Sequence, residues 1–251
     1  MQIARTITRT IIVGAMITAG LPGRAATSDP AMTLAVATAE KAVCRPTLKV
    51  DAVSYEAGTA FLVAGSQSLL LTAQHLFGPD GGLATAVAWQ DMPTHAHIAS
   101  CRPIGAGASL SGETAIAIPS AHPMDAADQS GAIYDVAVFR TSPPGDASPG
   151  LTLAVSPPKE GDRVWLVAKA QGSTSLLHSA HVLGSKNGAL LFAYDDPKLD
   201  LQATSGAPIV DTDGKVVGLN LGGDYDNGAK TVIGVADDLA VLTTAVATAG
   251  R

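Results

Sequence analysis

The chain has 251 residues, of which 47% are hydrophobic and 15% charged, so it can bury a core and is too poor in charge for a disordered protein. Its formal net charge is −6 and it contains no run of Lys or Arg, which argues against binding to a nucleic-acid backbone. Aromatic residues make up only 4%, so the core must be built from Val, Leu, Ile and Ala.

Residues 1–25 have the pattern of a signal peptide. Two arginines precede the apolar stretch 11–21, and Gly23 and Ala25 are the small residues of a cleavage site. The stretch is shorter than the roughly 20 apolar residues of a membrane-spanning helix. We therefore expect export to a secreted or periplasmic location and no membrane insertion of the cleaved chain; an uncleaved anchor is the alternative. Cleavage leaves 13 basic and 22 acidic residues, a net charge of −9.

Residues 26–43 form an N-terminal segment of open role, with a helical composition over 31–43. The only two cysteines are Cys44 and Cys101. In an exported protein such a pair suggests one disulfide, whereas two buried free thiols are the alternative.

From about residue 44 to 235 the chain alternates short apolar runs with Gly, Pro, Asp and Asn, which predicts β-structure. Tight turns are expected at 211–214 (Asp-Thr-Asp-Gly) and 227–228 (Asn-Gly). The predicted strands are 58–64, 68–72, 84–90, 114–119, 136–140, 163–168, 179–184, 189–194, 207–211, 216–221 and 231–235.

The segment 141–150 holds three prolines and two glycines and predicts a linker between 44–140 and 151–251. Residues 236–249 have a helical pattern that begins with two acids, Asp237 and Asp238. The pattern predicts an all-β protein with a C-terminal helix, built as two small barrels or sandwiches; one larger sandwich fits it as well.

Three segments carry candidate chemistry. Ser205 lies among small residues before an apolar strand, as a nucleophile on a rigid turn requires, with backbone N–H groups available for an oxyanion. His75 follows a predicted strand in the sequence Thr-Ala-Gln-His. Asp135 begins the strand Asp-Val-Ala-Val, where a buried carboxylate can orient an imidazole.

Together these segments resemble the trypsin-like (chymotrypsin-fold) serine peptidases, in particular exported bacterial members related to the HtrA and glutamyl-endopeptidase groups. The family's motifs correspond to residues 72–75, 135–138 and 203–208, in the family's order, and the similarity covers roughly 55–248. No PDZ-like domain is expected after the catalytic region.

The resemblance implies two six-stranded antiparallel β-barrels with a triad of His75, Asp135 and Ser205 between them. It also implies an oxyanion hole from the backbone N–H groups of Ala203 and Ser205. The positions that it assigns to substrate binding are Leu199, Asn220, Leu221 and Gly222. We expect a monomer that cleaves protein or peptide substrates without a cofactor or metal.

Two departures from the family pattern keep alternatives open. Ala203 stands where the family has a glycine, and alanine adopts fewer conformations. A catalytically inert binding module is therefore the second hypothesis, and an esterase is a variant of the first. Thr204 replaces the usual Asp or Asn, which argues against activation by an ion pair to a released N-terminus.

Leu199 indicates an apolar primary pocket, whereas an inward Asp200 indicates a preference for basic residues.

The remaining polar clusters have simpler interpretations. The histidine pairs 95/97 and 178/181 have no acidic or cysteine partners at metal-site spacing, so exposed histidines are expected. Residues 211–214 and 224–228 are hairpin turns rather than calcium loops because they have no EF-hand glutamate. His122, with Asp125 and Asp128, is a weaker rival acid–base cluster in a loop.

Overall fold

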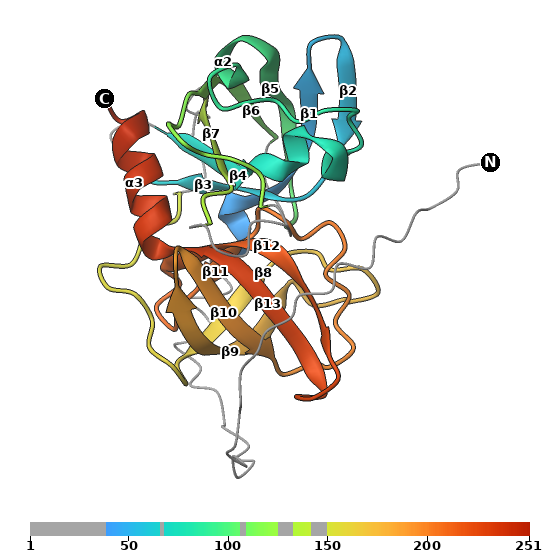
Figure 1. Cartoon of the computed structure of the whole chain (residues 1–251), viewed down its shortest axis with the longest axis vertical. Helices are drawn as coiled ribbons and strands as arrows, with labels where there is room; N and C mark the ends of the chain where they lie inside the picture. Colours follow the sequence, from blue (N-terminus) through green and yellow to red (C-terminus); the bar gives the residue numbers. More distant parts are fainter. Residues whose placement is uncertain (1–38, 66–67, 106–108, 125–132, 142–149) are drawn as a thin grey trace, which may run out of the picture.

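A computed structural model describes residues 39–65, 68–105, 109–124, 133–141 and 150–251 (Figure 1). The predicted signal peptide lies outside the described residues, as do 26–38 of the N-terminal segment and 142–149 of the linker. Of the helix expected over 31–43, the described part holds only the 3-10 turn η1 (Glu40–Ala42). Within the described residues, no helix has the length and apolar character needed to cross a membrane.

The first barrel closes in the order β1-β3-β4-β7-β6-β5, with β5 pairing back to β1, and every pairing is antiparallel. A further strand, β2, extends the edge of β1 as a hairpin. The strands are β1 (Val43–Val50), β2 (Val53–Glu56), β3 (Ala60–Val63), β4 (Leu69–Ala73), β5 (Ala96–Pro103), β6 (Leu110–Ile116) and β7 (Val136–Thr141). Three short helices lie in the connection between β4 and β5: η2 (Gln74–Phe77), η3 (Pro79–Gly81) and α2 (Met92–His95).

The second barrel closes in the order β10-β13-β12-β11-β8-β9, again antiparallel throughout. Its strands are β8 (Arg163–Val167), β9 (Leu177–Lys186), β10 (Ala189–Tyr194), β11 (Pro208–Val210), β12 (Val216–Asp226) and β13 (Thr231–Asp238). The two closed barrels confirm the predicted two six-stranded antiparallel β-barrels and exclude the single larger sandwich.

The terminal helix α3 (Leu239–Ala249) packs beside the junction of the barrels and contacts β7 and β12 (Figure 1). It begins three residues later than predicted because β13 extends to Asp238. The Asp238 side chain accepts hydrogen bonds from the N–H groups of Ala240 and Val241, so it caps the helix instead of lying in its first turn.

The strand prediction was wrong in two ways in the first barrel. Strands β1, β2 and β5 were missed, because β1 and β5 carry Arg, Lys and His at half-exposed and exposed positions that interrupt the apolar pattern. The strand predicted over 84–90 is a loop, in which Val87 donates a hydrogen bond to the carbonyl of Phe77. The barrel is closed by six other strands, so this alternating segment has no neighbour to pair with.

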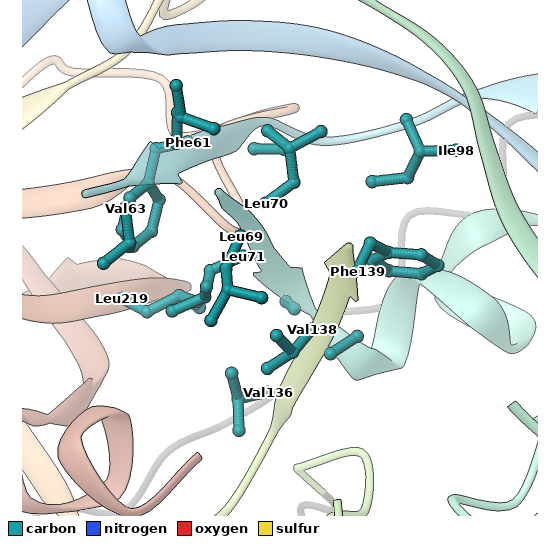
Figure 2. Close-up of a cluster of buried hydrophobic side chains, with 14 of the residues drawn as sticks. Phe61, Val63, Leu69, Leu70, Leu71, Ile98, Val136, Val138, Phe139 and Leu219 are labelled. Atoms are coloured by element: carbon teal, nitrogen blue, oxygen red, sulfur yellow. The ribbon is translucent and has the colours of Figure 1, made fainter. Parts of the chain in front are cut away.

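One apolar cluster fills the first barrel and continues into the second. Figure 2 shows Phe61, Leu70 and Phe139 within it, and Leu219 of β12 reaching it from the second barrel. A separate cluster around Phe192 fills the second barrel. Cys44 and Cys101 form a disulfide, with sulfur atoms 2.03 Å apart, that joins β1 to β5. The apolar junction fixes the positions of the chain segments that emerge between the barrels.

Candidate active site

The pairing of β4 with β7 brings His75 and Asp135 together. Ala73 is the register partner of Val136, so the residues just after β4 and just before β7 lie side by side. The His75 ring nitrogen Nδ1 is 2.7 Å from Asp135 Oδ2. Because a carboxylate only accepts hydrogen bonds, Nδ1 carries the proton, and Nε2 is the ring nitrogen with an acceptor lone pair in the neutral imidazole.

The Asp135 carboxylate is fully buried and accepts three hydrogen bonds from the first barrel. Its Oδ1 accepts from the backbone N–H of His75 at 2.8 Å, and its Oδ2 accepts from the imidazole and from the backbone N–H of Met124 at 2.8 Å. Hydrogen bonds to the ionised form compensate for the loss of water around a buried charge. These hydrogen bonds therefore hold the carboxylate in one orientation, with its negatively charged Oδ2 facing the His75 imidazole.

A second buried carboxyl supports Asp135 from the other barrel. Asp237 Oδ1, on β13, accepts a hydrogen bond of 3.1 Å from the backbone N–H of Asp135. Burial raises the pKa of Asp237 well above its usual value, and the nearby negative charge of Asp135 raises it further. Both effects favour the protonated form of the Asp237 carboxyl in the folded protein.

Two consecutive turns in the second barrel, 201–204 and 204–207, position Ser205, which lies in the second of them. The N–H of Thr204 bonds the carbonyl of Leu201 at 3.1 Å, and the N–H of Ala207 bonds the carbonyl of Thr204 at 3.0 Å. The third residue of each turn has a positive φ, 62° at Ala203 and 84° at Gly206, which is typical of type II turns.

Gly206 places Ser205 next to the strand that leads to His75. A Cβ atom at Gly206 would lie 2.2 Å from the carbonyl oxygen of Thr59 and 3.0 Å from the backbone nitrogen of Ala73, so no side chain fits there. Ala73 is two residues before His75. In this structure the Ser205 hydroxyl donates a hydrogen bond of 3.1 Å to the carbonyl of Leu221.

Both barrels hold the carbonyl groups of this turn. From the first barrel, Thr59 donates its N–H to the Ser205 carbonyl at 2.8 Å and its hydroxyl to the Ala203 carbonyl at 3.0 Å. From the second barrel, the Asn220 amide donates to the Thr204 carbonyl at 3.1 Å. All three carbonyls are paired, whereas the N–H groups of Ala203 and Ser205 have no acceptor within the described residues.

The residues predicted to bind substrate occupy different environments. Leu199 is buried at a pocket of about 340 Å³ that Leu201, Val232 and the exposed Asp200 also line. The carbonyl of Leu221 accepts the hydrogen bond of the Ser205 hydroxyl. At Gly222, no atom lies within 4 Å of the position that a Cβ atom would take.

Asn220 is fully buried behind the turn. Its backbone bonds Gly206 and Ala207, and its side chain bonds Thr204. Thr59, Met124 and Asp237 were not identified as site residues from the sequence, because their roles depend on contacts with residues distant in the chain.

The other polar clusters do not assemble into a site. No group of three His, Cys, Asp or Glu side chains in the described residues is arranged to hold a metal ion. His95 pairs with Asp51 on the surface at 2.7 Å, and His178 is buried against the carbonyl of Ala168. His122 contacts the carbonyl of Pro123, whereas its supposed partners, Asp125 and Asp128, lie outside the described residues.

The arrangement can be compared with known proteins. The family model for the trypsin-like peptidase domain matches residues 58–219, well over half of the chain. The chain belongs to the trypsin-like peptidase domain family. Among curated proteins, none matches the sequence significantly.

Solved structures similar to this trypsin-like peptidase domain include two forms of Rv3671c from M. tuberculosis. The active form of that protease has 18% identity and a TM-score of 0.55, over 93% of this chain and 95% of that chain. Its inactive form has 18% identity and a TM-score of 0.54, over 90% and 98%. Kallikrein-related peptidase 10 has 17% identity and a TM-score of 0.56, over 86% and 98%. At these identities the similarity shows the fold alone.

Proposed function

We propose that this chain is an exported serine endopeptidase that hydrolyses peptide bonds through an acyl-enzyme formed on Ser205. The observation that carries the proposal is the asymmetry of the Ser205 turn. All three of its carbonyls are paired, whereas the N–H groups of Ala203 and Ser205 have no acceptor among the described residues. Two open N–H groups beside a serine hydroxyl fit an oxyanion and little else.

In the proposed mechanism Ser205 Oγ leaves the Leu221 carbonyl and attacks the scissile carbonyl of the substrate. His75 Nε2 accepts the hydroxyl proton and delivers it to the leaving amine, while Asp135 stabilises the imidazolium through Nδ1. The oxyanion accepts hydrogen bonds from Ala203 and Ser205. Water then attacks the acyl-enzyme, with His75 again as the base.

The inert-module hypothesis is weakened by the conformation of Ala203. This hypothesis requires that alanine at residue 203 does not adopt the conformation that glycine adopts in the family. Ala203 has a φ of 62°, in the left-handed region. One observation still favours the inert module: the Ser205 hydroxyl donates its hydrogen bond to the carbonyl of Leu221.

We further propose that the substrate residue before the scissile bond is small or apolar. Leu199, at the position that floors the primary pocket in the family, is only 7% exposed, and Leu201 and Val232 line the same pocket. Asp200 accepts a hydrogen bond from the N–H of Gln202 and is exposed at the edge of the pocket. Asp200 is therefore in contact with solvent, whereas Leu199 and Val232 of the same pocket are buried.

A fluorophosphonate probe tests the nucleophile. We expect it to label the wild-type protein at Ser205 and not to label Ser205→Ala. The matched control is Ser179→Ala, because the Ser179 hydroxyl also donates a hydrogen bond, in its case to the Asp195 carboxylate at 2.6 Å. This variant should be labelled like the wild type. A folded wild-type protein that is not labelled at Ser205 and cleaves no member of a peptide library would favour the inert module, and cleavage of simple esters alone would indicate an esterase.

A further inference from the structure

Thr204 is the shared corner of the two turns that present Ser205. Its N–H closes the first turn and its carbonyl closes the second. The first turn has Ala203 at the position where type II turns favour glycine, and its φ of 62° is unfavourable for a residue with a Cβ atom. Such a conformation persists only if the surroundings hold it, so the contacts of the neighbouring Thr204 decide whether the Ala203 N–H keeps its direction.

The side chain of Thr204 is fully buried and bonded in two directions. Its hydroxyl donates to the carbonyl of Leu201 at 2.7 Å and accepts from the Asn220 amide nitrogen at 3.0 Å. The same nitrogen donates to the Thr204 carbonyl at 3.1 Å. A carbonyl cannot donate, so the nitrogen of the amide must face Thr204. The bonds form a continuous series from Asn220 through Thr204 to Leu201, in which each bond strengthens the next.

Asn220 maintains this series at a cost to stability. Its side-chain oxygen Oδ1 is buried and has no hydrogen-bond partner within the described residues. A buried acceptor without a partner destabilises the folded state, and an apolar residue of the same size avoids that penalty. The backbone of Asn220 already bonds Gly206 and Ala207, so the amide is not needed to attach β12 to the turn. Among the described residues, the hydrogen bonds of the amide itself are both made to Thr204.

We propose that Thr204 and Asn220 are positioning residues that hold Ala203 in its left-handed conformation, so that its N–H faces the oxyanion together with the N–H of Ser205. Neither side chain touches the substrate. This inference rests on the proposed function, because it assigns a role in the same reaction. The pair thereby substitutes for the glycine that the turn would otherwise require at residue 203.

The test compares Thr204→Val, which keeps the shape and removes the hydroxyl, with Thr204→Ser, which keeps the hydroxyl. We expect Thr204→Val to lower kcat and the rate of fluorophosphonate labelling about tenfold or more, with KM changed less than about threefold, because oxyanion contacts act in the transition state. Thr204→Ser should recover most of the rate. Thr231→Val is the matched control, since the Thr231 hydroxyl bonds the carbonyl of Tyr194 away from the turn; its kcat should be that of the wild type.

A second change distinguishes positioning from general destabilisation. Glycine adopts positive φ without strain, so Ala203→Gly in the Thr204→Val background should restore part of the lost kcat. If Thr204→Val does not fold, Asn220→Ser replaces it, because this variant leaves the Thr204–Leu201 bond intact; its kcat should fall in the same direction.

Three results would overturn the inference: equal rates for Thr204→Val and the wild type, an effect on KM alone, or no restoration by glycine at residue 203. Where Asn220→Ser is used instead, an unchanged kcat overturns it. Wild-type protein that is not labelled at Ser205 overturns the proposed function and this inference together. Wild-type labelling with an unaffected Thr204→Val overturns this inference alone.

Discussion

The first barrel contributes a carboxylate whose two oxygens accept three hydrogen bonds, whereas the second contributes a turn with two N–H groups that have no acceptor within the described residues. The Asp135 carboxylate is charged before the substrate binds, so its hydrogen-bond donors must already be in place. On the Ser205 side the charge develops during the reaction, so its partners must be present and unused. The difference shows how one junction can be rigid throughout and still keep hydrogen-bonding capacity for a transition state.

The largest effect is expected from removing the charge on the first-barrel side. In Asp135→Asn the side chain keeps its size but cannot accept all three hydrogen bonds or stabilise an imidazolium. We expect kcat to fall on the order of 10⁴-fold with little change in KM. Steady-state kinetics on a peptide substrate measures this, with circular dichroism as the check on folding. A loss below about tenfold would mean that Asp135 is not the orienting group.

On the second-barrel side we expect a loss of stability from Gly206→Ala. The added Cβ would lie 2.2 Å from the Thr59 carbonyl oxygen and 2.4 Å from the Thr72 hydroxyl, at a φ of 84°. The clash and the strain together should lower the free energy of unfolding by about 3 kcal/mol. Chemical denaturation measures the change.

The control for this change is Gly172→Ala. Gly172 has a φ of 74° but no atom within 4 Å of an added Cβ. It should show the backbone strain alone, about 1 kcal/mol. Equal losses in the free energy of unfolding at Gly172 and Gly206 would show that the first barrel does not pack tightly against the Ser205 turn.

The side chains proposed for catalysis could be predicted from the sequence because each follows or precedes a strand with a local signal. His75 comes two residues after β4, and Asp135 directly precedes β7. The strand predicted over 189–194 is β10, with these bounds. Such features depend on neighbours along the chain, and a single sequence contains them. Tertiary pairing then brings the segments together, as the family resemblance implied.

The contacts that hold the turn could not be predicted in this way. The Thr59 hydroxyl meets the carbonyl of Ala203 across 144 residues, and nothing local marks Thr59 among the other threonines of the chain. Asn220 was assigned to substrate binding because its strand runs beside the substrate in the family. Its burial depends on which way the side chain points from β12, which the barrel determines and the local sequence does not.

The smallest expected effect concerns Asp237, where the two barrels meet behind Asp135. Its carboxyl is fully buried, and its Oδ2 has no hydrogen-bond partner within the described residues. Among the described residues, Asp135, Asp238 and Tyr134 are the titratable groups that interact electrostatically with it. Burial raises the pKa of Asp237 in the folded protein and the negative charges of Asp135 and Asp238 raise it further, whereas in the unfolded chain the pKa is about 4.

The sign of the resulting pH dependence follows from proton counting. Above about pH 4 the unfolded chain releases the proton of Asp237 and the folded protein keeps it, so Asp237 lowers the stability increasingly as the pH rises towards its folded-state pKa. Asn at residue 237 can still accept from the Asp135 N–H but has no proton to lose. Asp237→Asn should therefore exceed the wild type in free energy of unfolding by a margin that grows with pH, by about 1.4 kcal/mol at most for each pH unit between the unfolded and folded pKa values of Asp237.

Urea denaturation at several pH values between 4 and 8 measures that margin, and all other titrating groups cancel in the difference between the two proteins. Asp224→Asn is the control, because Asp224 is exposed and its replacement should give no growing margin. A margin for Asp237→Asn that is the same at every pH would mean that Asp237 is ionised in the folded protein. In that case a second buried charge would lie behind Asp135, and the carboxylate on the first-barrel side would owe its orientation to repulsion as well as to its three donors.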